Sequence, residues 1–252
     1  MWTCDDNCKY SCMRRNVQTR EIQEEPLVKY YGKWPFDRYL GCQEIASTIF
    51  SIFNFIPHLY FGWNNRRIFP EHFYMRNWWL AYSMLAMNTW LWSTVFHARD
   101  VLWTERLDYF CASLTIVFSV VCALIRLCRI QDFNRQSLVL VPCMFLFLIH
   151  ISYLQFVHFD YGYNMKASLA VGLIHSTLWI VYALVICKWY VWRLLFCTVG
   201  LWAAASLEVF DFPPYWGIFD AHSIWHGLTP PIAVLFYWFL AEDASIQRLH
   251  PD

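Results

Sequence analysis

Seven long apolar stretches separated by short polar breaks constrain this chain more than any other feature of its sequence. A helix that crosses the hydrocarbon core of a bilayer needs about 20 mostly apolar residues. The stretches cover residues 41–63, 77–97, 107–127, 137–157, 165–187, 193–209 and 219–240. The sequence therefore predicts an all-α membrane protein, built as a bundle of seven transmembrane helices.

The composition agrees with a membrane protein. Of the 252 residues, 58% are hydrophobic and only 15% are charged, whereas a soluble domain carries about 25% charged residues. The formal net charge is zero and no long basic run occurs, so the sequence lacks the electrostatic signature of a nucleic-acid-binding protein. We therefore expect the lipid bilayer, and no nucleic acid, among its partners.

The basic residues between the apolar stretches predict how the bundle is oriented. Lys and Arg concentrate in the first, third and fifth connecting loops. Because cytoplasmic loops carry the excess of basic residues, we expect a luminal or extracellular N-terminus and a cytosolic C-terminus. The chain then divides into a luminal arm with cysteines (1–38), a membrane domain (39–242) and a cytosolic tail (243–252).

Three cysteines in the arm fit an oxidising compartment. Cys4, Cys8 and Cys12 form an odd set, so either Cys42 pairs with one of them or their partners lie upstream of Met1. Residues 1–38 contain no signal peptide, and we expect a form shortened at its N-terminus. Free thiols on a polar arm are the alternative.

Five side chains that can carry chemistry are expected to meet at the luminal side of the bundle. Ser93 and His97 lie four residues apart and therefore share one face of the second helix. His222 and His226 have the same spacing on the seventh helix, and Asp108 begins the third. Since the second helix ends at the lumen and the other two start there, all five residues lie at one depth.

Three imidazoles beside a carboxylate favour a catalytic zinc site. His97, His222 and His226 can supply three ligands of a tetrahedral zinc ion and leave the fourth position to water. Zinc lowers the pKa of bound water to about 7 and polarises a carbonyl, which suits hydrolysis of an ester or amide. Asp108 can take a proton from the water and return it to the leaving group. Ser93 can hydrogen-bond the water or the developing oxyanion.

Several simpler interpretations stay open. Intramembrane His and Ser side chains often only hydrogen-bond between helices, for about 1 kcal/mol each. Glu44, at the start of the first helix, is most simply a solvated charge, although with Asp37 it could instead hold a calcium-like ion. Pro230 cannot donate to the carbonyl of His226, so the seventh helix should kink there, either to open a lateral cleft for a lipid or only for packing.

The same residues, together with longer motifs, resemble a known family. A Ser and a His four residues apart, an Asp, and two His four residues apart are similar to the pattern of the CREST superfamily of membrane hydrolases, which includes alkaline ceramidases. The closer resemblance is to the family of post-GPI attachment to proteins factor three, the GPI-specific phospholipase A2-like lipid-remodelling proteins. The matching stretches are WTCDDNCKYSCM, GKWPF, WSTVFHARD, LDYFCAS, FDYGYN, LEVFDFPP and DAHSIWH.

The resemblance implies a function that composition and spacing do not give. It implies zinc ligation by His97, His222 and His226, with Ser93 and Asp108 assisting catalysis. The implied reaction removes the sn-2 acyl chain from the GPI anchors of proteins, so GPI-anchored proteins are the expected substrates. The implied location is the Golgi or endoplasmic reticulum, with the site towards the lumen.

Three other functions remain as alternatives. A ceramidase-like enzyme would hydrolyse an amide at the same site. A receptor or scaffold would use the zinc ion only structurally. A transporter is disfavoured, because the sequence shows neither an internal repeat nor an evident polar stripe through the bilayer.

Overall fold

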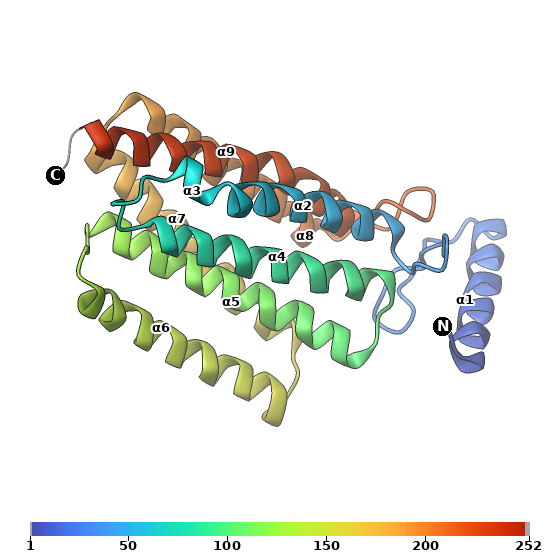
Figure 1. The fold of residues 1–252 in the computed structure, drawn as a ribbon. Coiled ribbons are helices and arrows are strands. Elements are labelled where there is room, and N and C mark those ends of the chain that lie inside the picture. Colours follow the sequence, from blue (N-terminus) through green and yellow to red (C-terminus); the bar gives the residue numbers. More distant parts are fainter. Residues whose placement is uncertain (1, 250–252) are drawn as a thin grey trace.

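The computed structural model describes residues 2–249, and the chain is almost entirely helical (Figure 1). Its long bundle helices are α2 (Ile45–Trp63), α4 (Arg76–Ala98), α5 (Leu102–Leu127), α6 (Phe133–Ser152), α7 (Tyr161–Ile186), α8 (Trp192–Phe210) and α9 (Ala221–Leu249). The shorter elements are α1 (Cys4–Ile22), α3 (Asn65–Ile68), the π-helical turn η1 (Tyr153–Val157) and the 3-10 turn η2 (Trp189–Val191). The predicted all-α class is confirmed.

The long helices coincide with the seven apolar stretches to within about five residues, except that α9 continues nine residues beyond the predicted end at residue 240. Among the described residues, six segments are long and apolar enough to cross a membrane: α2, α5, α6 with η1, α7, η2 with α8, and α9. Helix α4 has a sufficient length of 23 residues, but Asn77, Asn88 and four tryptophans lower its mean hydropathy. The chain is therefore a multi-pass membrane protein by the length and composition of its helices.

Six of the long helices form a closed ring, and α6 lies outside it. Helix α2 packs against α4 and α9, α4 against α5, α5 against α7, and α8 against both α7 and α9. Helix α6 packs on the outer side of α5 (Figure 1). Helix α7 follows α6 in the chain but packs mainly against α5 and α8.

One end of the ring contains a closed polar network within an aromatic core. Arg126, near the end of α5, forms two hydrogen bonds with Asp243 on α9, with Nε–Oδ2 and Nη2–Oδ1 distances of 2.7 and 3.0 Å. The hydroxyls of Tyr182 and Tyr190 donate to the same carboxylate. Arg126 and Asp243 are 2% and 1% exposed. The first residues of the predicted cytosolic tail thus continue α9 and are partly buried.

The N-terminal arm docks on the opposite end of the bundle, with α1 beyond that end (Figure 1). Trp34 donates its indole N–H to Asp211 at 2.8 Å, and Lys29 forms an ion pair with the same carboxylate. The N–H of Asp37 donates to the carbonyl of Gly217 at 2.9 Å. Gly217 has φ +68°, and a side chain there would collide with Asp37, so glycine permits this close approach.

The cysteines of the arm are unpaired. Cys4, Cys8 and Cys12 are exposed on α1, and Cys42 is a free, half-buried thiol. The pairing of Cys42 with one of the other three is therefore not formed in the structure.

Helix α2 carries a buried polar stripe that sequence analysis missed. Ser47, Ser51, Asn54 and His58 recur every three or four residues and are each at most 4% exposed. This spacing places them on one helix face, turned towards the neighbouring α4 and α9. This polar face covers the part of α2 from Ser47 to His58.

Candidate metal centre

Three imidazole rings meet where α4 ends and α9 begins. His97 lies in the last turn of α4, and His222 and His226 lie in the first two turns of α9. The Nε2 atom of His222 is 2.9 Å from Nε2 of His226 and 3.3 Å from Nε2 of His97. One ligand atom from each ring lies within 4.8 Å of the other two. The three histidines can therefore hold a metal ion.

Two of the rings are oriented by carboxylates. Nδ1 of His97 lies 2.7 Å from Oε2 of Glu44, and Nδ1 of His222 lies 2.7 Å from Oε2 of Glu208. Because an ionised carboxylate only accepts hydrogen bonds, each Nδ1 atom donates its proton outward. Tyr161 donates to the other oxygen of Glu208 at 2.7 Å. Both Nε2 atoms therefore direct a lone pair inward.

The third ring is oriented by a serine of the α2 stripe. Nδ1 of His226 lies 3.0 Å from Oγ of Ser51. Ser51 donates its own proton to the carbonyl of Ser47 at 2.7 Å, so its oxygen accepts from His226. In their neutral forms all three imidazoles consequently present Nε2 lone pairs to one another, an arrangement that a shared cation stabilises.

Ser93 and Asp108 lie beside the imidazoles. Ser93 is buried one turn before His97, and its Oγ is 3.1 Å from Oγ of Ser51. The side chain of Asp108, half-buried on α5, lies beside Ser93 and interacts electrostatically with His97 and His222. The structure thus gathers the five side chains in one group, while their individual roles remain a proposal.

Glu44 was predicted to be a solvated charge, but its side chain is buried in the structure. It is only 5% exposed, because its carboxylate lies between His97 and the ammonium of Lys33, which is 2.6 Å away. Lys33 also pairs with Asp100 at 2.8 Å. Asp37, the expected partner in a calcium-like site, instead pairs with Arg14 at 2.8 Å. The arm therefore supplies a positive charge to the partner of a candidate metal ligand.

Glu44 and Lys33 each stabilise the charged form of the other. Burial alone would raise the pKa of Glu44, but Lys33 and His97 hold it well below its usual range. Burial alone would lower the pKa of Lys33, but Glu44 and Asp100 raise it above its usual value. Both groups are therefore ionised at neutral pH.

The backbone of His226 is held by a second contact with α2. Its carbonyl accepts the side-chain amide of Asn54 at 2.8 Å and the hydroxyl of Thr229 at 3.0 Å. This carbonyl is free because Pro230 has no N–H to donate to it. Helix α9 runs through Pro230 and Pro231 as one helix, and the kink remains a prediction.

Aromatic rings surround the histidines. Trp90 and Trp225 pack on His226, with ring centroids 5.3 and 4.7 Å away. Phe96 packs on His97 at 5.0 Å. Trp90 and Trp225 therefore form part of the wall around the candidate metal ligands.

Sequence analysis missed Glu208 and Ser51, the partners of His222 and His226, although the sequence contains features that could have identified both. Glu208 is a carboxylate within the predicted sixth stretch (193–209), and ionisable residues in membrane spans are functional by default. Ser51 belongs to the polar stripe on α2, which has the period of one helix face. Their pairing with His222 and His226, respectively, depends on packing between helices distant in sequence.

Comparison with known proteins identifies the family. The model of the Per1-like family matches residues 1–244. GPI-specific phospholipase A2-like PGAP3 of Danio rerio is 38% identical over 250 residues, which cover 96% of this chain and 78% of that protein. The human protein of the same name is 36% identical over 249 residues, covering 96% of this chain and 77% of its own length. The Protein PER1 homolog of Schizosaccharomyces pombe is 38% identical over 253 residues, covering 97% and 76%. These matches confirm the resemblance found in the sequence motifs, and the chain belongs to the Per1-like family.

Proposed function

We propose that this chain is a zinc-dependent membrane hydrolase that removes the sn-2 acyl chain from the GPI anchors of proteins. The observation that carries the proposal is the convergence of three Nε2 atoms from two helices, each with its Nδ1 atom engaged elsewhere. The names of the relatives, GPI-specific phospholipase A2-like, support the ester bond and the substrate class.

The dimensions of the histidine group support zinc. In a tetrahedron whose corners lie about 2.0 Å from the centre, as zinc-bound nitrogens do, the corners are about 3.3 Å apart. The measured Nε2 separations of 2.9 and 3.3 Å are close to this value. Carboxylates on the outer nitrogens of His97 and His222 are typical partners of zinc ligands. When bound, zinc would supply Lewis acidity to the ester carbonyl and a more acidic water.

The other residues of the group orient ligands and move protons. Glu44, Glu208 and Ser51 hold the three rings with Nε2 inward. The carboxylate of Asp108 takes a proton from the attacking water and returns it to the departing sn-2 alkoxide, so ester and water become a fatty acid and a lyso-lipid. Ser93, which lies beside Asp108, can donate its hydroxyl proton to the oxyanion.

The proposed orientation places the histidines at the luminal side of a seven-span bundle. The connecting loops at the other end carry the basic residues Arg66, Arg67, Arg76, Arg129, Arg135, Lys188 and Arg193. The positive-inside rule assigns that end to the cytosol. The arm (1–38) is then luminal, 39–242 forms the membrane domain and 243–252 faces the cytosol, in the Golgi or endoplasmic reticulum.

The test replaces one ligand and measures metal and product separately. We expect His222→Ala to lose the zinc found by elemental analysis of the purified chain, and cells that depend on this variant to retain the sn-2 acyl chain on their GPI anchors. His158→Ala is the control, since His158 is exposed in the α6–α7 loop. Unchanged metal content and unchanged lipid profiles with His222→Ala would refute the proposal.

Two further assays separate the alternative functions. If the purified chain cleaved ceramide amides but no acyl ester of a GPI lipid, the assignment of the substrate would be wrong. If Asp108→Asn kept full function in cells, hydrolysis would not be the activity, because this change preserves shape and removes the proton acceptor.

A further inference from the structure

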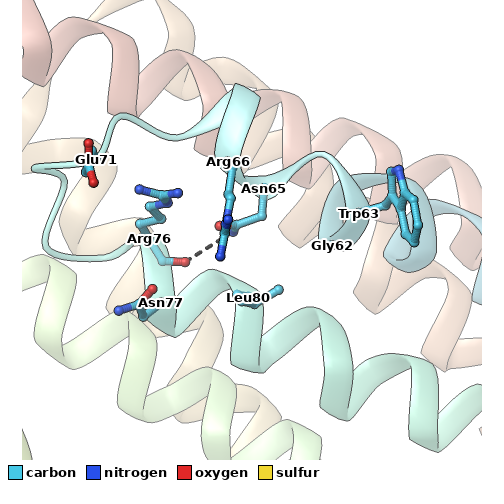
Figure 2. Close-up of a pocket in the computed structure, with 8 residues that line it drawn as sticks. All are labelled: Gly62, Trp63, Asn65, Arg66, Glu71, Arg76, Asn77 and Leu80. Carbon is cyan, nitrogen blue, oxygen red and sulfur yellow. Dashed lines mark hydrogen bonds between the residues drawn. The ribbon is translucent and has the colours of Figure 1, made fainter.

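A cavity of about 630 Å³ opens at the end of the bundle opposite to the histidines. It lies where the chain leaves α2, passes through α3 and enters α4 (Figure 2). The charged side chains that line it are Arg66, Arg76 and Glu71, and Trp63 lies at its margin (Figure 2). The site proposed for hydrolysis uses none of these residues.

The cavity contains more positive than negative charge. Within residues 2–249, the side chains of Arg66, Arg76 and Glu71 form no hydrogen bond or ion pair. The Arg76 backbone is fixed, since its carbonyl accepts the side-chain amide of Asn65 at 3.1 Å (Figure 2). Two guanidinium groups and one carboxylate therefore face the cavity without neutralising partners.

The cavity is placed at the level of lipid headgroups by the helix that leads to it. The apolar segment of α2 ends at Trp63, which is 85% exposed. Ile56, Leu59 and Tyr60 are also exposed, and their spacing with Trp63 places them on one outer face of α2. Acyl chains can pack along this face, while the Trp ring marks the boundary with water.

We propose that this cavity binds the headgroup of an anionic phospholipid, with its acyl chains along the outer face of α2. Arginine forks bind phosphate and carboxylate groups through paired hydrogen bonds. The charge pattern of two cations and one anion matches a headgroup with two anions and one ammonium, as in phosphatidylserine. Arg66 and Arg76 bind the phosphate and the serine carboxylate, and Glu71 accepts from the ammonium.

The proposal is tested by titrating the purified full chain, in a neutral detergent, with short-chain phosphatidylserine and counting bound lipids by native mass spectrometry. We expect Arg66→Gln and Arg76→Gln to weaken binding by about fivefold each. The matched control is Arg67→Gln, an exposed neighbour on α3 that does not line the cavity; its effect should stay below about twofold. Equal losses for all three variants, or equal binding of phosphatidylcholine, would overturn the proposal.

Glu71→Gln provides an independent test, because it should change the binding affinities for two lipids in opposite directions. It should weaken binding of phosphatidylserine, which has an ammonium, and strengthen binding of phosphatidic acid, which has none. A change in the same direction for both lipids would contradict the assigned headgroup. Soluble phosphoserine is the final arm, and if it bound as tightly as the lipid, the ligand would be a free phosphate compound and the lipid site would be wrong.

Discussion

The two ends of the helix bundle both bury polar groups, but they differ in whether those groups satisfy one another. The carboxylate of Asp243 accepts from Arg126 and from the hydroxyls of Tyr182 and Tyr190. At the other end, three imidazoles face one another through Nε2 atoms that, within residues 2–249, have no other hydrogen-bond donor beside them.

This difference separates a structural polar cluster from a functional one. Buried polar groups generally find hydrogen-bond partners within the protein, as they do around Asp243. Burying several hydrogen-bond acceptors that face one another costs free energy unless a cation binds between them. Protein contacts alone complete the first cluster, whereas the second is suited to a cation from outside the chain. Their responses to mutation, chelation and pH should therefore differ.

The largest expected loss of stability comes from opening the closed cluster. Arg126→Leu leaves the Asp243 carboxylate buried without its cation, which should lower the free energy of unfolding by about 3–5 kcal/mol. Denaturant unfolding in detergent micelles measures this change. The double variant Arg126→Leu with Asp243→Leu should recover much of the loss. A single variant as stable as the parent chain would show that the pair is not structural.

The next largest effect is the removal of a cation from the histidine cluster. With zinc at a hundredfold excess over its dissociation constant, a chelator should lower the free energy of unfolding by about 2.7 kcal/mol. His97→Ala should abolish this sensitivity, because the metal site is incomplete. If the variant and the parent chain responded equally to chelation, the metal would be bound elsewhere.

Loosening one ligand should have a smaller effect than losing it. Glu208→Gln weakens the acceptor for Nδ1 of His222, and we expect zinc affinity to fall by about tenfold to a hundredfold. Competition with a fluorescent chelator measures this affinity. Glu105→Gln is a suitable control, since Glu105 also lies near this end of the bundle but interacts with Asp100, Lys33, Arg106 and Asp108 rather than with a histidine. Equal affinities of the two variants would remove Glu208 from the site.

The contact between Asn54 and His226 gives a smaller and more specific effect. Asn54→Leu should cost about 1 kcal/mol of stability, since it removes a donor from a buried carbonyl. In a Pro230→Ala background the new N–H at position 230 can bond that carbonyl, so the same Asn54→Leu change should cost less. The double-mutant cycle measures this coupling. Additive effects would mean that the proline and the amide act independently.

The smallest expected effect is the contribution of Glu44 to the pH dependence of the stability. Its pKa in the folded chain lies below the ordinary value of 4.5, so the unfolded chain binds the proton first as the pH falls. The stabilisation is thus complete above that value and is lost at lower pH. With metal removed, the gap between the unfolding temperatures of the parent chain and Glu44→Gln should be constant above pH about 5 and should close as the pH falls below about 4.5. A constant gap would contradict the depressed pKa.

The structural features that could be predicted from the sequence are those that depend on a single helix. The apolar stretches are long enough to specify the helices, and the four-residue spacing of Ser93 with His97 and of His222 with His226 fixed their faces. The freed carbonyl of His226 followed from proline chemistry alone.

What the sequence did not predict depends on several helices packing together. The burial of Glu44 requires Lys33 from the arm and His97 from α4, and no local pattern encodes that meeting. The exclusion of α6 from the ring is equally non-local, because α6 and its neighbours have similar apolar composition.

The closure of the ring between α2 and α9 has a consequence for biogenesis. His97 and its partner Glu44 are synthesised with the first half of the chain, whereas His222, His226 and Pro230 arrive with the last helix. Asn54 and Ser51, both on α2, can form their hydrogen bonds with the backbone and the ring of His226 only after α9 has been synthesised. A nascent chain that lacks α9 therefore has only one of the three imidazoles, and the candidate metal centre is complete only once the first and last bundle helices have joined.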